Sequence, residues 1–73
     1  MVHHDFSELT VFALVVEQGG LTPVASSLGL PKSTLSRRIS QLENRVGQRL
    51  LLRHSNRLTP TEAGNLFYKY CKQ

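Results

Sequence analysis

The stretch LPKSTLSRRISQLENRVG, residues 30–47, decides the fold because it combines two patterns on one predicted helix. Its apolar residues follow the i, i+4, i+7, i+11 spacing of a narrow buried stripe, and they are Leu35, Ile39, Leu42 and Val46. At about 100° per residue, the residues that point away from this stripe are Ser33, Arg37, Ser40 and Asn44. The pattern therefore predicts a helix with one buried side and one polar, basic side, flanked by Thr34 and Ser36.

The sequence defines the C-terminal end of this helix more clearly than its N-terminal end. Gly47 follows the last apolar position and is expected to end the helix. At the other end Pro31 stands where a capping hydroxyl would help, which leaves Ser33 or a backbone group as the alternative cap.

The preceding residues LTPVASSLG, 21–29, predict a short helix. Thr22 is its expected N-cap and Pro23 its first helical residue, where a missing amide hydrogen costs nothing. Gly29 can close the helix in the left-handed conformation, and the residues expected to face inward are Val24, Ala25 and Leu28. Two helices joined by so tight a glycine-containing turn are typical of a helix-turn-helix.

A first helix is predicted from about Ser7 to Gln18, with Asp5 or Ser7 as its cap and Gly19-Gly20 at its end. Its apolar residues fall on two faces, one with Phe6, Leu9, Ala13 and Val16 and the other with Val11, Leu14 and Val15. A helix that is apolar nearly all round needs burial on two sides. The sequence leaves two explanations open, a partner subunit or a central place in a small fold.

The stretch QRLLLRHSNRLTP, residues 48–60, changes character. An apolar run, a His-Ser-Asn turn cluster and a resumed Arg57-Leu58 predict a two-stranded hairpin. Its expected tip consists of Arg53, His54, Ser55, Asn56 and Arg57. So short a hairpin is not stable alone, so it must pack on the helices.

A fourth helix should begin near TPTEAG, residues 59–64. Thr59, Pro60 and Glu62 fit a capping box, and Thr61 is an equally plausible cap. The apolar residues expected on one face are Ala63, Leu66, Phe67 and Tyr70, broadened by Tyr68 and Cys71.

The charge of this 73-residue chain, which is short enough for one domain only, is unevenly distributed. The net charge is +4, yet residues 1–31 contain no lysine or arginine, while residues 32–57 contain seven of the nine with Glu43 as the single carboxylate. A positive block that also carries hydroxyls favours a polyanion as partner over an ordinary solvated helix face.

Several classes of protein are disfavoured by composition. The longest apolar run, Val11 to Val16, is too short to span a bilayer, and no signal peptide is evident. The single Cys71 excludes an internal disulfide and is expected to be a small buried hydrophobe. We therefore expect a cytoplasmic protein without a membrane partner.

An enzymatic function is also disfavoured. His3, His4 and His54 have no carboxylate or thiol cluster beside them, so no metal site is expected. The chain shows no nucleophile elbow and no Gly-rich phosphate loop. We expect no enzyme and no cofactor.

A helix with a buried stripe and a small, polar, basic opposite face suits the DNA major groove. Hydroxyls allow a close approach, and Arg37 can pair with guanine in a bidentate contact worth about 1–3 kcal/mol of discrimination. The hairpin tip suits a flanking minor groove or its phosphates, and the N-terminal end of the second helix can hold a phosphate. The candidate DNA-binding residues are Thr22, Lys32, Ser33, Thr34, Ser36, Arg37, Arg38, Arg53, His54, Asn56 and Arg57.

Two motif pairs carry a family resemblance: A-x-x-L-G-L followed by S-R-R-I-x-x-L-E-x-x-V-G, and L-x-R followed by L-T-P-T-E-A-G. They resemble the N-terminal DNA-binding domain of LysR-type bacterial transcriptional regulators over nearly the whole chain. The resemblance implies a mainly α winged helix-turn-helix over residues 1–58, with a three-helix core and a hairpin wing. It implies the start of a linker and dimerisation helix at residues 59–73.

The same resemblance implies partners and roles. The groove residues would be Lys32, Ser33, Thr34, Ser36 and Arg37, with Arg53 and its turn as the wing. The fourth helix would pair with that of another subunit near the first helix, forming a homodimer on double-stranded DNA. A small-molecule effector would bind a C-terminal domain that these residues do not include. Pro23 and Pro31 depart from the commonest pattern, but both fall at helix starts, where proline is tolerated.

One alternative function remains open from the sequence. Winged helices also bind proteins, so the basic helix would then meet an acidic protein partner. The salt dependence of duplex binding separates the two hypotheses, because released counterions give a steep fall of affinity with salt.

Overall fold

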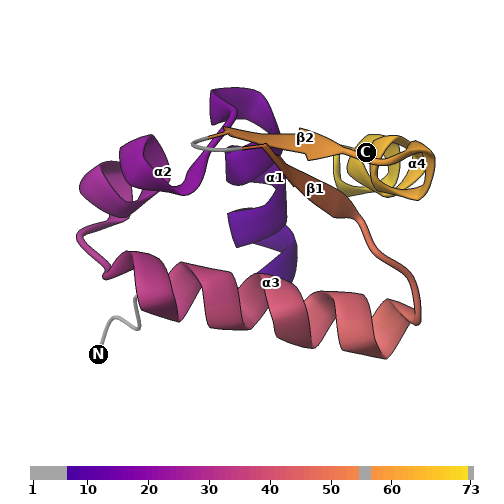
Figure 1. Ribbon diagram of the computed structural model, residues 1–73, viewed down its shortest axis with the longest axis horizontal. Helices are drawn as coiled ribbons and strands as arrows, with labels where there is room; N and C mark the ends of the chain where they lie inside the picture. The colour runs from indigo at the N-terminus through magenta and orange to yellow at the C-terminus, as the bar shows by residue number, and fades with distance from the viewer. Residues whose placement is uncertain (1–6, 55–56, 73) are drawn as a thin grey trace.

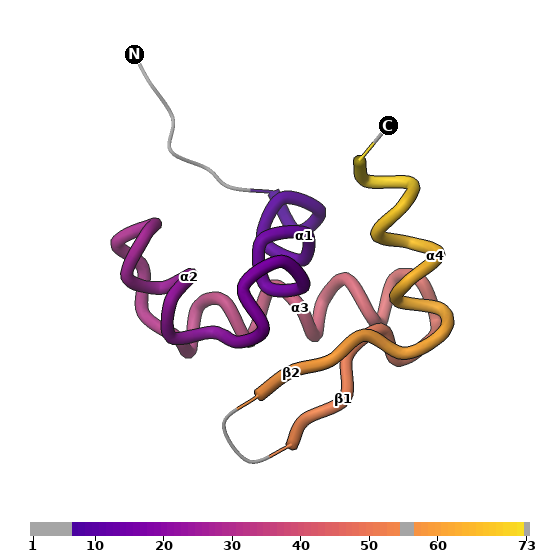
Figure 2. The backbone as a smooth tube through the Cα atoms, turned by 90° about the horizontal axis from the view of Figure 1, so that it is seen from above, coloured from indigo at the N-terminus to yellow at the C-terminus, as the bar shows by residue number. Residues whose placement is uncertain are grey.

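The computed structural model describes residues 7–54 and 57–72, and within them the chain forms four helices and one antiparallel two-stranded sheet (Figure 1). The elements in chain order are α1 (Glu8–Gln18), α2 (Leu21–Leu28), α3 (Lys32–Val46), β1 (Leu51–His54), β2 (Arg57–Pro60) and α4 (Glu62–Cys71). α3 lies along one edge of the molecule, with α1 above its middle and the hairpin beside the upper part of α1 (Figures 1 and 2). This arrangement confirms the mainly α winged helix-turn-helix predicted from the sequence.

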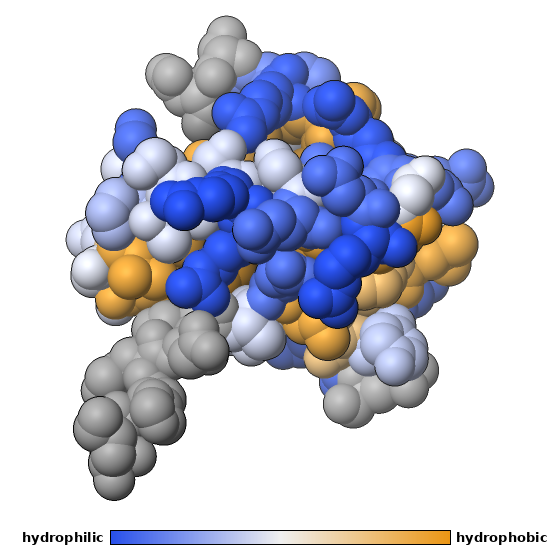
Figure 3. Space-filling model, turned by 90° about the horizontal axis from the view of Figure 1, so that it is seen from below, coloured by the Kyte–Doolittle hydropathy of each residue, from blue (hydrophilic) through white to orange (hydrophobic). Residues whose placement is uncertain are grey.

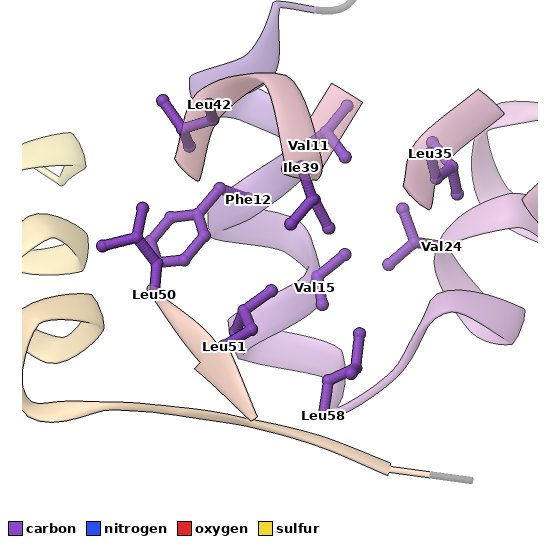
Figure 4. Packing of buried hydrophobic residues seen from close by; sticks show 10 residues of the cluster. All are labelled: Val11, Phe12, Val15, Val24, Leu35, Ile39, Leu42, Leu50, Leu51 and Leu58. Carbon is purple, nitrogen blue, oxygen red and sulfur yellow. The ribbon is translucent and has the colours of Figure 1, made fainter. Parts of the chain in front are cut away.

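The core lies between α1, α2, α3 and the base of the hairpin (Figure 4). Its buried residues are Val11, Phe12, Val15, Val24, Leu35, Ile39, Leu42, Leu50, Leu51 and Leu58. No polar or charged side chain is buried among the described residues. Because full burial of an apolar side chain contributes about 1.5–3 kcal/mol, this cluster is the main source of stability.

α1 is the central helix, since it contacts all three other helices and β2. One predicted apolar face, with Val11 and Val15, faces the core together with Phe12, which belonged to neither predicted face. Phe12 also contacts Phe67 of α4 edge to face, with ring centroids 5.7 Å apart. The other predicted face is only partly covered, and Leu9 remains 38% exposed.

Two helix caps match one of the sequence alternatives. The Ser7 hydroxyl accepts a hydrogen bond from the Thr10 amide at 3.2 Å and caps α1. The Thr61 hydroxyl accepts from the Gly64 amide at 3.0 Å and caps α4. Thr61 is therefore the cap, and Thr59 and Pro60 belong to β2.

The predicted N-cap of the second helix is wrong. α2 begins at Leu21, one residue before Thr22, and its N-cap is Gly20, which makes no side-chain capping hydrogen bond. Pro23 still falls in the first turn, where no amide needs to donate within the helix. Likewise α3 has Pro31 as N-cap without a side-chain hydrogen bond.

Three residues of the predicted apolar stripes are exposed in the structure. Val46 is 37% exposed because it is the last residue of α3, beyond the elements that cover the helix. Leu66 and Tyr70 are 65% and 63% exposed, because α4 turns a different face inward. The residues of α4 that pack against the core are Ala63, Phe67, Tyr68 and Cys71.

Candidate nucleic-acid interface

The two sides of α3 differ in burial as the sequence predicted. Leu35, Ile39 and Leu42 are at most 5% exposed, which anchors the helix and turns its other side to solvent. The exposed residues on that side are Lys32, Ser33, Arg37, Ser40, Gln41 and Asn44. Figure 3, which views the molecule from the α3 side, shows hydrophilic side chains across this face and apolar ones at its margins. We call this surface together with the hairpin the α3–hairpin face.

Three candidate residues lie at the borders of this face. Thr34, Ser36 and Arg38 are half-buried, as expected for residues that flank the apolar stripe. Farther along α3, Arg45 forms an ion pair with Glu8 at 3.3 Å. Some residues at the borders of α3 thus make contacts within the protein, while the residues along the middle of its polar side are exposed to solvent.

The base of the hairpin is fixed to the C-terminal half of α3 by one carboxylate. Glu43 Oε2 accepts hydrogen bonds from the Leu50 amide at 2.8 Å and the Leu51 amide at 3.1 Å. On the other strand the Leu58 amide donates to the Gly19 carbonyl oxygen at 3.1 Å. These bonds attach both strands to helices, so the hairpin has a defined position beside α3.

The strand register explains where the hairpin side chains point. β1 and β2 pair Leu51 with Pro60, Arg53 with Leu58, and His54 with Arg57. Because side chains alternate along a strand, Arg53 shares the inward face with the buried Leu51 and Leu58. His54 lies on the other face, where its Nε2 is 3.1 Å from Thr59 Oγ1.

Arg53 bridges the hairpin and α3. Its Nη2 donates a hydrogen bond to Ser36 Oγ at 2.8 Å, across 17 residues of sequence. Both residues were predicted as DNA-binding, but nothing local in the sequence connects them. The two-residue alternation from the apolar Leu51 to Arg53 is the signal that could have placed this arginine toward α3.

A cleft of about 380 Å³ separates the hairpin from the N-terminal ends of α2 and α3. Its lining consists of Leu21, Thr22, Lys32, Ser33, Ser36, Arg53, Arg57 and Leu58. Six of these were candidate DNA-binding residues, so the fold gathers candidates from three separate segments. Among the residues that the structure describes, this lining has three cationic groups and no carboxylate, which makes the cleft attractive to an anion.

Some candidates fall outside this cluster. Arg37 and Arg38 line a neighbouring cleft between α3 and the start of α1, and Asn56 lies outside the described residues.

Within residues 7–54 and 57–72 no group of three or more histidine, cysteine or acidic residues is arranged to hold a metal ion. None of the helices formed by those residues is long and apolar enough to cross a membrane.

A second surface, formed by α1 and α4, has a different chemistry. A groove between these helices is lined mostly by Leu9, Thr10, Ala13, Leu14, Tyr70 and Cys71. Leu66 and Tyr70 of α4 are exposed beside it. Burial raises the pKa of the half-buried Cys71 thiol, which keeps it in the neutral form. We call this surface the α1–α4 face.

Glu17 joins the C-terminal ends of α1 and α4 at the border of that groove. Its Oε2 accepts a hydrogen bond from the Tyr68 hydroxyl at 2.8 Å and lies 3.2 Å from Lys72 Nζ. The Tyr68 hydrogen bond and then Lys72 lower the pKa of Glu17. The same carboxylate raises the pKa of Tyr68 and of Lys72.

Comparison with known proteins identifies the family. Residues 6–65 match the family described as bacterial regulatory helix-turn-helix protein, lysR family. The iron-regulated virulence regulatory protein IrgB of Vibrio cholerae is 48% identical over 69 residues, which are 94% of this chain and 23% of IrgB. The chain spans 20–23% of the length of such curated relatives.

Solved structures of related proteins are similar to this chain in both fold and sequence. Full-length AphB, a virulence activator of Vibrio cholerae and a member of the LTTR protein family, superposes with a TM-score of 0.85 at 46% identity, covering 89% of this chain and 22% of AphB. The BenM DBD in complex with catB site 1 DNA superposes with a TM-score of 0.83 at 37% identity, covering 89% of this chain and 72% of that one. This chain therefore belongs to the lysR family of bacterial regulatory helix-turn-helix proteins.

Proposed function

We propose that the chain binds double-stranded DNA sequence-specifically as the DNA-binding domain of a LysR-type transcriptional regulator. The observation that carries the proposal is the division of α3 into a buried stripe and an exposed polar side next to a cationic cleft. An α-helix fits the major groove, and the adjacent cations suit the phosphates that border it. The DNA complex of the BenM DBD supports the same use of this fold.

Each part of the face has a role in this proposal. The exposed residues of α3, with Arg37 at their centre, meet base edges in the major groove. The hairpin meets the flanking minor groove or backbone, and Thr22 at the start of α2 holds a phosphate. The residues assigned to DNA contact are Thr22, Lys32, Ser33, Thr34, Ser36, Arg37, Arg38, Arg53, His54, Asn56 and Arg57.

Arg37→Ala and Arg53→Ala test the proposal together. A duplex recovered from a random pool by the parent chain serves as target, and a scrambled duplex of equal composition as control. Arg37→Ala should lose about 1–3 kcal/mol of preference for the target, while Arg53→Ala should weaken binding to both duplexes more evenly. The parent's affinity should also fall steeply with salt.

A parent chain that binds neither duplex at low salt would contradict the proposal and favour an acidic protein partner. Equal affinities of both variants and the parent for both duplexes would also count against it. Fluorescence anisotropy over a series of salt concentrations provides all of these measurements.

We also propose that two copies pair through the α1–α4 face. The exposed Leu66 and Tyr70 next to an apolar groove support this pairing, because a monomer gains nothing from exposing them. In the whole protein α4 would be the start of a linker helix, and a small-molecule effector would bind outside these 73 residues. We place the whole protein in the cytoplasm.

Sedimentation of the chain with a target duplex tests the pairing. Two copies per duplex are expected for the parent, and Leu66→Asp should reduce this to one by placing a charge in the contact. Asn65→Asp, which adds the same single charge at an exposed position farther round the same helix, is the matched control. A single copy per duplex for the parent would contradict pairing through these residues.

A further inference from the structure

The strand register places Arg53 on the inward face of the hairpin. Its strand neighbours on the same face, Leu51 and Leu58, are buried at 3% and 8% exposure. Arg53 itself is exposed, because it lies where the core ends and the cleft begins. Its side chain therefore leaves the strand on the buried face, and its guanidinium lies at the surface beside α3.

The position of this guanidinium is restricted at two levels. The hairpin is held by hydrogen bonds from the Leu50 and Leu51 amides to Glu43 and from the Leu58 amide to the Gly19 carbonyl oxygen. The side chain is then held by the 2.8 Å hydrogen bond to Ser36. A guanidinium has five N–H donors, so one bond to Ser36 leaves the others for an anion in the cleft.

We propose that Ser36 is a positioning residue that holds Arg53 in place for the DNA backbone, and this inference rests on the proposed function above. Ser36 was assigned to DNA contact above, and this inference refines that role: Ser36 contributes to binding mainly by holding Arg53 and less by its own contact with DNA. The hydrogen bond removes in advance part of the side-chain freedom that Arg53 would otherwise lose on binding. The same hydrogen bond connects the hairpin to α3, so that both elements would contact DNA in a fixed relative position.

A double-mutant cycle on DNA affinity tests this inference at one fixed salt concentration. The variants are Ser36→Ala, Arg53→Ala and the double variant, measured on a duplex selected by the parent chain. Ser36→Ala should weaken binding about three- to tenfold in the parent and less than about twofold when Arg53 is already absent. Alanine favours helix, so α3 is retained, and circular dichroism checks this.

A matched cycle with Ser33 serves as control. Ser33 lies one turn earlier on α3, lines the same cleft, and has no side-chain hydrogen bond to another described residue. Ser33→Ala should weaken binding by the same factor with or without Arg53. Ser36→Thr, which keeps the hydroxyl, should restore affinity to within about twofold of the parent.

Nuclear magnetic resonance of the free chain gives a readout that does not depend on DNA. The Arg53 guanidinium should show slowed rotation and distinct Nη signals in the parent and in Ser33→Ala, and should lose them in Ser36→Ala. Equal Ser36→Ala effects in both backgrounds, or unchanged Arg53 signals, would overturn the inference while leaving DNA binding intact. A parent that binds no duplex would instead overturn the proposed function, and the inference with it.

Discussion

The α3–hairpin face and the α1–α4 face share one core but have opposite chemistry. The first has Lys32, Arg53 and Arg57 around a polar cleft, and the second has Leu66 and Tyr70 beside an apolar groove. A 73-residue domain has little interior, so both faces are supported by the same ten buried residues.

The difference shows how a small domain separates two kinds of recognition. The polar face suits a highly charged partner whose binding falls with salt, whereas the apolar face suits another protein surface. α1 lies between them: Phe12 and Val15 face the core, and Leu9 faces the groove. Substitutions can therefore be chosen to affect both faces, the connection between them, or one face alone.

The largest effect should come from Phe12→Ala, which removes a fully buried side chain from the core that both faces share. Loss of a fully buried phenylalanine costs about 3–5 kcal/mol, and domains of this size have only about 4–11 kcal/mol of stability. Urea unfolding followed by circular dichroism should show this loss. Leu66→Ala, at an exposed site, should change stability by no more than about 0.5 kcal/mol. Similar effects for the two variants would show that the faces do not depend on a common core.

A smaller effect is expected from Gly64→Ala, which changes the contact between α4 and the hairpin base. A Cβ at this position would overlap the Leu50 carbonyl oxygen, and that oxygen accepts a hydrogen bond from the Thr61 amide at 2.9 Å. Glycine to alanine inside a helix normally stabilises by about 0.5–1 kcal/mol. Here overpacking should dominate and destabilise by about 1–3 kcal/mol.

The control for Gly64→Ala is Asn65→Ala, an exposed neighbour in the same helix. Thermal unfolding should show a lower Tm for the first variant and a nearly unchanged Tm for the second. A stabilised Gly64→Ala would mean that α4 can move away from the hairpin without cost.

The smallest effect concerns the α1–α4 face alone and depends on pH. The pKa of Glu17 is lowered from its ordinary value of 4.5, so its contribution is present above that value and lost as pH falls through the lowered pKa. The pKa values of Tyr68 and Lys72 are raised from 10.0 and 10.5, so their contribution is present below those values and lost as pH rises through the raised ones.

Glu17→Gln should therefore lower Tm slightly between pH 6 and 9, and its difference from the parent should shrink in acid and in strong alkali. Glu62→Gln, an exposed carboxylate at the other end of α4, is the control. A parent–variant difference that stays constant from acid to alkali would contradict the role of these ionisations.

Local signals in the sequence predicted the elements but not all of their contacts. Gly29 and Gly47 end α2 and α3 in the left-handed conformation, as expected from their places after apolar stripes. Thr22 was wrong as a cap because Gly20 allows the helix to begin one residue earlier. Leu66 and Tyr70 were grouped with Ala63 and Phe67 on one apolar face, but only Ala63 and Phe67 pack against the core, because a short helix with apolar residues on two sides does not reveal which side is covered.

The candidate site was predictable in composition and less so in geometry. Exposure of Ser33 and Arg37 follows directly from the stripe that anchors α3. The hydrogen bond from Arg53 to Ser36 joins residues 17 positions apart, and it depends on how the hairpin packs on α3. Glu43 was similarly counted only as a charge, although it holds the base of β1.

The connection between β2 and α4 has a mechanical consequence. β2 ends at Pro60 and α4 begins at Glu62, so Thr61 alone joins them, and its hydroxyl and amide bond to the Arg49 and Leu50 carbonyl oxygens. A connection of one residue, hydrogen-bonded at both its amide and its hydroxyl, leaves little freedom between β2 and α4. A change in the direction of α4 is therefore expected to change the tilt of the hairpin as well.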